Sequence, residues 1–306
     1  MSGSRKGLAT RGGWRLLPLL AVLFSTVACL EHTVLLKLRP DGSGELIETT
    51  FLKGQMLEMA RAMAATEEGG EGAGLLAGQA DEKRAEAEAR AAQLGEGVTF
   101  VSWEALSGEG SEGERAVYRF ADVSTLRISP APASEDGEGA PMGASEDVIR
   151  FRFGDGAEGS HRLVAVFGDE PAPEAAGDAV AGEAMADVEP AAADGVEGMA
   201  GMEEMADSMG AGMMEMMKPF LQGMKMQVLV EVEGEVVTTD APFSDGSTVT
   251  LLALDFDQIV ADPEAWKKLS AMDSDASLSV LGPQLQGLPG VRAPSGREVA
   301  IEFREP

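Results

Sequence analysis

Several residue types that build functional sites are scarce in this 306-residue chain. It contains one cysteine, two histidines and one tyrosine, and aromatic residues make up 5% of it. One cysteine cannot form an internal disulfide or a cysteine-based zinc site. Basic residues are also few, since 24 Lys and Arg stand against 52 Asp and Glu, a formal net charge of −28. This charge argues against a nucleic-acid-binding protein, which needs a basic surface to replace the phosphate counterions.

What the chain does contain is enough apolar sequence for a folded core. Hydrophobic residues make up 44% of it, and its length allows one large or two modest domains. Because aromatics are rare and methionine is frequent, we expect an aliphatic, Met-rich core with long acidic segments outside it.

The N-terminus has the pattern of an export signal. Four basic residues and no acid occur in residues 1–15, and an apolar run follows from Leu16 to Ala28. A positive segment before a short apolar run is typical of a secretory signal peptide, whereas a membrane-spanning helix needs roughly 20 apolar residues. We predict a signal peptide over residues 1–28.

The end of this run is Thr26-Val27-Ala28-Cys29, which places small residues before the only cysteine. The segment resembles the lipobox of bacterial lipoproteins, with Thr26 where Leu is usual. The resemblance implies cleavage between Ala28 and Cys29 and lipidation of the Cys29 thiol. Several acyl chains anchor a protein stably, whereas one gives only marginal membrane binding. The implied partner is therefore the membrane, reached through lipidated Cys29.

The same resemblance implies a destination. Leu30 follows the cysteine, so the Asp of an inner-membrane retention signal is absent. We expect an exported protein anchored to the outer membrane, facing the periplasm or the cell surface. Cleavage would change the formal net charge from −28 to −32, because residues 1–28 contain four bases and no acid. A strand-like pattern begins within about three residues of Cys29, so the first folded element would lie close to the membrane.

Residue patterns along the mature chain predict hairpins and helices. Pro40-Asp41-Gly42-Ser43-Gly44 predicts a tight turn between two strands, and Gly234 predicts a hairpin between residues 224–233 and 235–240. We predict strands at 32–39, 45–52, 98–104, 115–120, 147–153, 161–167, 224–233, 235–240, 247–256 and 297–303, and helices at 53–66, 81–94, 202–221, 257–261 and 263–271. Helices clustered between hairpins indicate an α+β fold with a mainly antiparallel sheet and helices packed on one face.

An acidic segment divides the mature chain. Residues 169–198 contain nine acids, no base and no aromatic residue, and are otherwise mostly Ala, Gly and Pro. Such a composition buries too little apolar area to offset chain entropy, so we predict a disordered linker. It separates an N-terminal α+β region, residues 29–168, from a C-terminal α+β region, residues 199–306. We favour one composite sheet completed by the C-terminal region.

Methionine is concentrated after the linker. A single helical stripe is formed by residues at spacings of three and four: Met202, Met205, Met209, Met213 and Met216. Such a stripe is typical of a core or of an adaptable contact surface for a ligand or partner. Thioethers also bind Cu(I), but no His or Cys stands nearby to complete a site. We therefore favour packing over copper, predict no metal site, and keep a groove for an acyl chain or partner helix as a third interpretation.

Catalytic chemistry has little support in the sequence. His32 and His161 lie in no recognisable catalytic or metal-ligand spacing. Paired carboxylates such as Asp255 and Asp257 are expected by chance in so acidic a chain, and Asp273-x-Asp275 lacks the glycine and distal Glu of a calcium loop. We predict no enzymatic activity, no catalytic residues and no cofactor.

The mature chain also resembles a family of exported bacterial lipoproteins of unassigned activity. The resemblance rests on Pro40–Gly44, on Leu94–Ser102 with Ala116–Phe120, and on Lys225–Asp257. A more distant similarity is to the LppM-type lipoprotein domain. The leading hypothesis is a lipid-anchored, non-enzymatic binding or scaffold module with an envelope protein or apolar ligand as partner. The alternatives are a carrier of a lipid or other apolar ligand, and a Cu(I)-handling lipoprotein.

Overall fold

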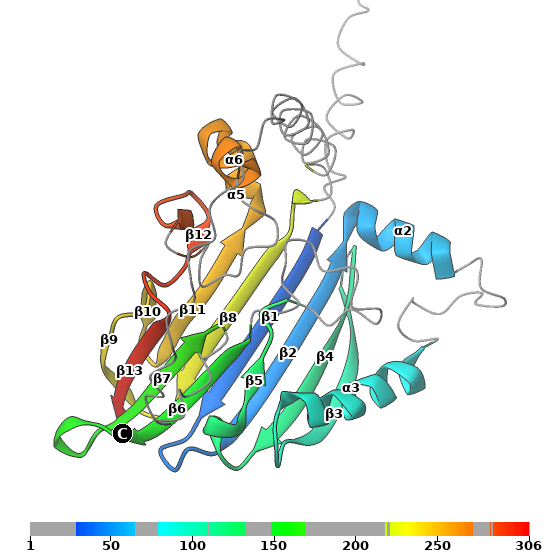
Figure 1. Cartoon of the computed structure of the whole chain (residues 1–306). Helices are drawn as coiled ribbons and strands as arrows, with labels where there is room; N and C mark the ends of the chain where they lie inside the picture. The colour runs from blue at the N-terminus through cyan, green and yellow to red at the C-terminus, as the bar shows by residue number, and fades with distance from the viewer. Residues whose placement is uncertain are drawn as a thin grey trace, which may run out of the picture.

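The structure is a computed structural model that describes residues 29–64, 79–108, 110–131, 148–168, 218, 221–271, 282 and 284–305. Over these residues the chain is α+β, with mainly antiparallel sheets, which confirms the predicted class (Figure 1). The predicted signal peptide, the acidic linker at 169–198 and nearly all of the predicted Met-rich helix lie outside the described residues.

A larger sheet forms the framework. Its eight strands follow the order β10–β11–β8–β1–β2–β4–β3, with β12 paired to β11. Their bounds are β1 Cys29–Leu38, β2 Gly44–Lys53, β3 Thr99–Gly108, β4 Ser111–Phe120, β8 Lys225–Val232, β10 Phe243–Asp245, β11 Thr248–Asp255 and β12 Val291–Arg292. The β1–β8 pair is parallel and the other pairs are antiparallel. The parallel pair joins the segments on either side of the acidic linker.

A smaller, five-stranded antiparallel sheet has the order β5–β6–β7–β13–β9. Its strands are β5 Arg127–Ile128, β6 Ile149–Asp155, β7 His161–Phe167, β13 Glu298–Arg304 and β9 Glu235–Thr239. The described strands therefore form two sheets, where we expected one composite sheet. Strands that follow the linker complete both of them.

The predicted hairpin about Gly234 is wrong. β8 pairs with β1 and β11 in the larger sheet, whereas β9 pairs with β13 in the smaller one. Gly234 has a φ of 153°, and a Cβ built there would lie 2.0 Å from the Arg304 carbonyl oxygen. The glycine thus lets the backbone pass close to β13 where the chain changes sheets, rather than turning a hairpin.

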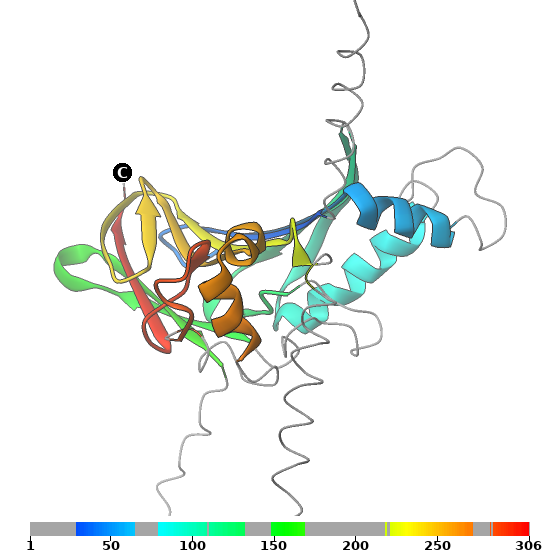
Figure 2. The same ribbon diagram turned by 90° about the horizontal axis from the view of Figure 1, so that it is seen from above.

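The helices and the smaller sheet lie on one side of the larger sheet (Figure 2). The helices are α2 Gly54–Ala64, α3 Ala80–Leu94, α5 Phe256–Ala261 and α6 Pro263–Ser270, and the short 3-10 helices η2 Val123–Thr125 and η3 Ala157–Gly159 lie in connections. Side chains of both sheets and of α3, α5 and α6 share one apolar core. We refer to the covered side as the inner face and to the other side as the outer face.

Strand alternation explains how the core forms. Val34, Leu36 and Leu38 of β1 are fully buried, while Leu35 and Lys37 between them are partly exposed. Successive side chains of a strand point to opposite faces, so one face is apolar and packed. Complete burial of each such side chain contributes about 1.5–3 kcal/mol. The outer face also holds cross-strand ion pairs, including Lys37 with Glu231 and Arg119 with Glu45.

Helix capping at the end of β11 follows the sequence. The Asp262 carboxylate accepts hydrogen bonds from the amides of Glu264 and Ala265, and Pro263 occupies the first turn of α6. Asp255 caps α5 through the Asp257 amide, and Asp257 accepts from the Gly223 amide at 2.7 Å. These carboxylates therefore have structural roles.

Candidate functional site

Cys29 is the first residue of β1 and the register partner of Lys53 at the end of β2. No spacer separates it from the folded sheet. α2 starts at the next residue, Gly54, and α5 starts where β11 ends, so both helices lie at the same end of the larger sheet (Figure 1). We call this end of the strands the Cys29 end. The β1–β2 turn lies at the opposite end of β1.

The other predicted site residues cannot be placed. Ala28 and the stripe of Met202, Met205, Met209, Met213 and Met216 lie outside the described residues. Their proposed roles in cleavage and in ligand or partner contact stay predictions.

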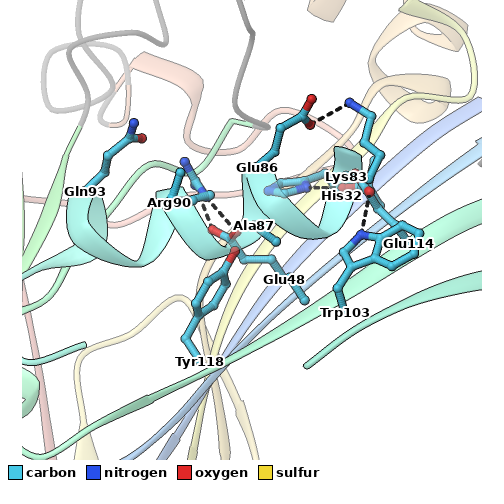
Figure 3. Close-up of a pocket in the computed structure, with 13 residues that line it drawn as sticks. His32, Glu48, Lys83, Glu86, Ala87, Arg90, Gln93, Trp103, Glu114 and Tyr118 are labelled. Atoms are coloured by element: carbon cyan, nitrogen blue, oxygen red, sulfur yellow. Dashed lines mark hydrogen bonds and ion pairs between the residues drawn. The ribbon is translucent and has the colours of Figure 1, made fainter. Parts of the chain in front are cut away.

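A pocket that we did not predict from the sequence lies between α3 and the inner face of the larger sheet. Its volume is about 500 Å³ (Figure 3). Strands β1 to β4 line one wall and α3 lines the other. Many of the lining side chains are polar, in contrast to the apolar inner face beneath the smaller sheet.

Strand register brings these polar side chains together. His32 on β1 stands opposite Thr50 on β2, which in turn stands opposite Glu114 on β4. Glu48, two residues before Thr50 on β2, points to the same inner face, and its register partner on β4 is Ala116. Three adjacent strands thus place a polar row where alternation would otherwise supply core residues.

Glu48 and Arg90 form the central ion pair of the pocket. Arg90 Nε donates to Glu48 Oε2 at 2.7 Å, and Nη2 donates to Oε1 at 2.7 Å. The Arg90 and Glu48 side chains are only 16% and 10% exposed. Burial alone would lower the pKa of Arg90, but its hydrogen bonds to Glu48 and the carboxylate charge outweigh burial and raise that pKa. The two hydrogen bonds between Arg90 and Glu48 fix α3 over the sheet.

His32 is almost completely buried beside this pair, at 3% exposure. Its Nδ1 lies 2.9 Å from Thr50 Oγ1, and its Nε2 is buried with no hydrogen-bond partner. Burial lowers the pKa of His32 from 6.5 to about 4; the Glu48 charge opposes this shift and the Arg90 charge adds to it. The ring is therefore neutral at pH 7, and one of its nitrogens is left unsatisfied.

Aromatic groups complete the sheet wall of the pocket. Trp103 Nε1 donates to Glu114 Oε2 at 2.9 Å. Tyr118 is fully buried. Its pKa is raised mainly by burial and, to a smaller extent, by the nearby Glu48 charge. It therefore stays protonated and able to donate a hydrogen bond. On the helix wall, Lys83 Nζ lies 2.8 Å from Glu86 Oε2.

This arrangement suits the binding of a polar molecule. It offers a neutral imidazole, a protonated phenol and charged groups held in pairs. Pockets of this kind use a few placed polar groups to orient a ligand. Among the described residues, no three His, Cys, Asp or Glu side chains are placed to share a metal ion.

The sequence held a signal for this pocket that alternation makes visible. His32 lies on the same face of β1 as Val34, Leu36 and Leu38, because it is an even number of residues away from each. Glu48 and Thr50 likewise lie on the same face of β2 as Leu46. Polar residues at inward positions indicate a polar cavity or a buried network. The second histidine, His161, lies elsewhere, at the start of β7, where it stacks on Phe153 with ring centroids 6.0 Å apart.

Comparisons with known proteins give little further information. No protein-family model and no curated protein matches the sequence. Among solved structures, the folded domain of LppM from Mycobacterium tuberculosis is similar at 9% identity and a TM-score of 0.30, covering 92% of this chain and 94% of that one. No helix among the described residues is both long enough and apolar enough to cross a membrane.

Proposed function

We propose that this protein is a lipid-anchored lipoprotein of the cell envelope that acts as a non-enzymatic binding module. The observation that carries the proposal is the Thr26–Cys29 motif, which ends directly at the first strand of the fold. A diacylated cysteine at this position would attach the larger sheet to the membrane without a flexible tether. The absence of Asp after Cys29 favours the outer membrane, facing the periplasm or the cell surface.

The pocket under α3 is the proposed binding site. Its buried Glu48–Arg90 pair and unpartnered His32 Nε2 favour a small polar ligand over an acyl chain, since charged groups are costly to cover with hydrocarbon. The carrier of an apolar ligand is therefore less well supported by this pocket. The Met-rich stripe and its copper interpretation depend on residues outside the described part of the chain.

Replacement of the cysteine tests the anchor. Cys29→Ser removes the thiol that would receive the lipid, so the variant should lose metabolic acyl labelling and accumulate as unprocessed precursor. Wild-type protein should label and partition into the membrane fraction. A processed Cys29→Ser variant that still partitions into membranes would contradict the proposal.

Native mass spectrometry of protein purified from membranes tests the pocket. We expect a small polar molecule to be retained by wild-type protein and lost from His32→Leu, while the exposed Arg115→Met variant retains it. Equal retention by all three proteins would place the ligand elsewhere.

A further inference from the structure

Helix α2 is placed where the proposed lipid anchor would meet the membrane. Cys29 pairs with Lys53, and α2 begins at Gly54, so the helix starts directly beside the first residue of the mature chain. Figure 1 shows α2 running across the Cys29 end and projecting beyond the sheet. Its position follows from the hairpin that joins β1 to β2 and does not depend on a long connection.

The two faces of α2 have different environments. Leu57 is 2% exposed, and Arg61, one turn later, donates from Nε to Glu112 Oε1 at 3.1 Å. These residues attach the helix to the sheet. Met59 is 48% exposed and, at about 100° per residue, lies roughly 200° around the helix from Leu57. The helix therefore presents an apolar side chain away from the protein.

The exposure of Met59 departs from the usual packing of a methionine stripe, whereas Met56 and Ala60 are partly buried. The sequence places Met56, Met59, Ala60 and Met63 at helical spacing, which is typical of a face that packs on a core. In the structure Leu57 makes the buried contact and Met59 is exposed. Because α2 lies beside the proposed lipid anchor, a membrane interface can cover this exposed apolar side chain.

The distance to the membrane is fixed by the chain itself. Cys29 is itself the first residue of β1, so no flexible segment would separate a lipid on Cys29 from the sheet. Each strand residue spans only about 3.3 Å, so the residues next to Cys29 would lie within a few ångströms of the membrane surface. Charge near the Cys29 end is balanced locally, because Lys53 pairs with Glu31 and Arg61 pairs with Glu58. Methionine is flexible and adapts to an irregular apolar surface.

We propose that α2 lies on the membrane surface with Met59 inserted at the boundary between headgroups and acyl chains. Helix α2 then provides a second contact with the membrane, besides the lipid at Cys29. Two contacts orient the molecule, with the β1–β2 turn directed away from the bilayer. This inference rests on the proposed lipidation of Cys29. The partner is the lipid surface itself.

The test uses the single cysteine of the chain. In lipidated protein the Cys29 thiol is blocked, so an introduced cysteine is the only free thiol. Full-length lipidated Met59→Cys is labelled with an environment-sensitive fluorophore and reconstituted into phosphatidylethanolamine–phosphatidylglycerol vesicles. Quenching is then measured with nitroxide-bearing lipids. Ala157→Cys, exposed in the β6–β7 connection, is the matched control.

We expect a blue-shifted emission and at least twofold stronger lipid quenching at position 59 than at position 157. An additional Gln55→Cys label on the exposed side of α2 should also be quenched, and Met59→Asp should reduce that quenching at least twofold. A label at position 59 that stays in water, or equal quenching at positions 59 and 157, would overturn the proposal.

Failure of the anchor itself would give a different result. If Cys29 is not lipidated, its thiol reacts with the fluorophore in wild-type protein, and the protein does not float with the vesicles. That outcome overturns both proposals, whereas vesicle binding with an unquenched position 59 overturns only the placement of α2.

Discussion

At the scale of single residues, the most informative groups are polar side chains at inward strand positions. His32, Glu48 and Thr50 occupy places that alternation assigns to the core. Buried polar groups cost free energy unless they are paired, and here Glu48 is paired with Arg90 while His32 Nε2 is not. Their effects on stability can be measured separately from any ligand.

His32 should make folding stability depend on pH. Burial lowers its pKa from 6.5 to about 4, so between these values the unfolded chain binds a proton that the folded chain does not. Stability is therefore lost as pH falls, by about 2 kcal/mol from pH 7.5 to pH 5 through this group alone. Urea denaturation of wild type and His32→Leu at both pH values checks this. The variant should lose about 2 kcal/mol less, and equal losses would contradict the assignment.

Breaking the Glu48–Arg90 pair should be costly. Arg90→Met leaves a carboxylate buried without its cation, and we expect a loss of about 3–5 kcal/mol in the free energy of unfolding. Arg115→Met is the control, because Arg115 and Glu104 are 44% and 54% exposed and such pairs contribute about 0–1 kcal/mol. Chemical denaturation compares the two. The double variant Glu48→Leu/Arg90→Met should recover part of the loss, and similar costs for both single variants would contradict a buried pair.

At the scale of secondary structure, the sequence predicts elements well but not always their partners. The strands before and after Gly234 lie near their predicted ranges, and the caps of α5 and α6 follow local sequence. The pairing of β9 with β13 was missed because a glycine between two strands is typical of a hairpin. Only the close approach of the Arg304 backbone, which depends on distant sequence, gives Gly234 its actual role.

Replacing Gly234 tests this crossing. Gly234→Ala puts a methyl group against the Arg304 carbonyl at a φ of 153°, so β13 or β9 must shift. Gly246→Ala is the matched control, since Gly246 also has a positive φ, 59°, but has open space around its Cβ position. We expect a loss of about 1–2 kcal/mol for Gly246→Ala from backbone conformation alone, and a clearly larger loss for Gly234→Ala. Thermal unfolding of both variants measures the difference, and equal losses would contradict the steric explanation.

At the scale of the whole molecule, fold class and anchor motif were accessible from sequence because both depend on local patterns. The pocket was not, because its walls come from β1, β2, β3, β4 and α3, which only the tertiary register brings together. The single cysteine belongs both to a local sequence motif and to the tertiary structure. It directly follows the predicted signal peptide, residues 1–28, and starts the first strand, so lipidation of this one residue would determine where the whole domain lies relative to the membrane.

The most direct test of the account is the mass of the N-terminal peptide of the mature protein, purified from the membranes of cells that express the full chain. We predict a peptide that begins at Cys29 and carries a thioether-linked diacylglycerol, with residues 1–28 absent. A mature peptide that begins at another residue, or one that contains Cys29 with a free thiol, would contradict the lipid anchor.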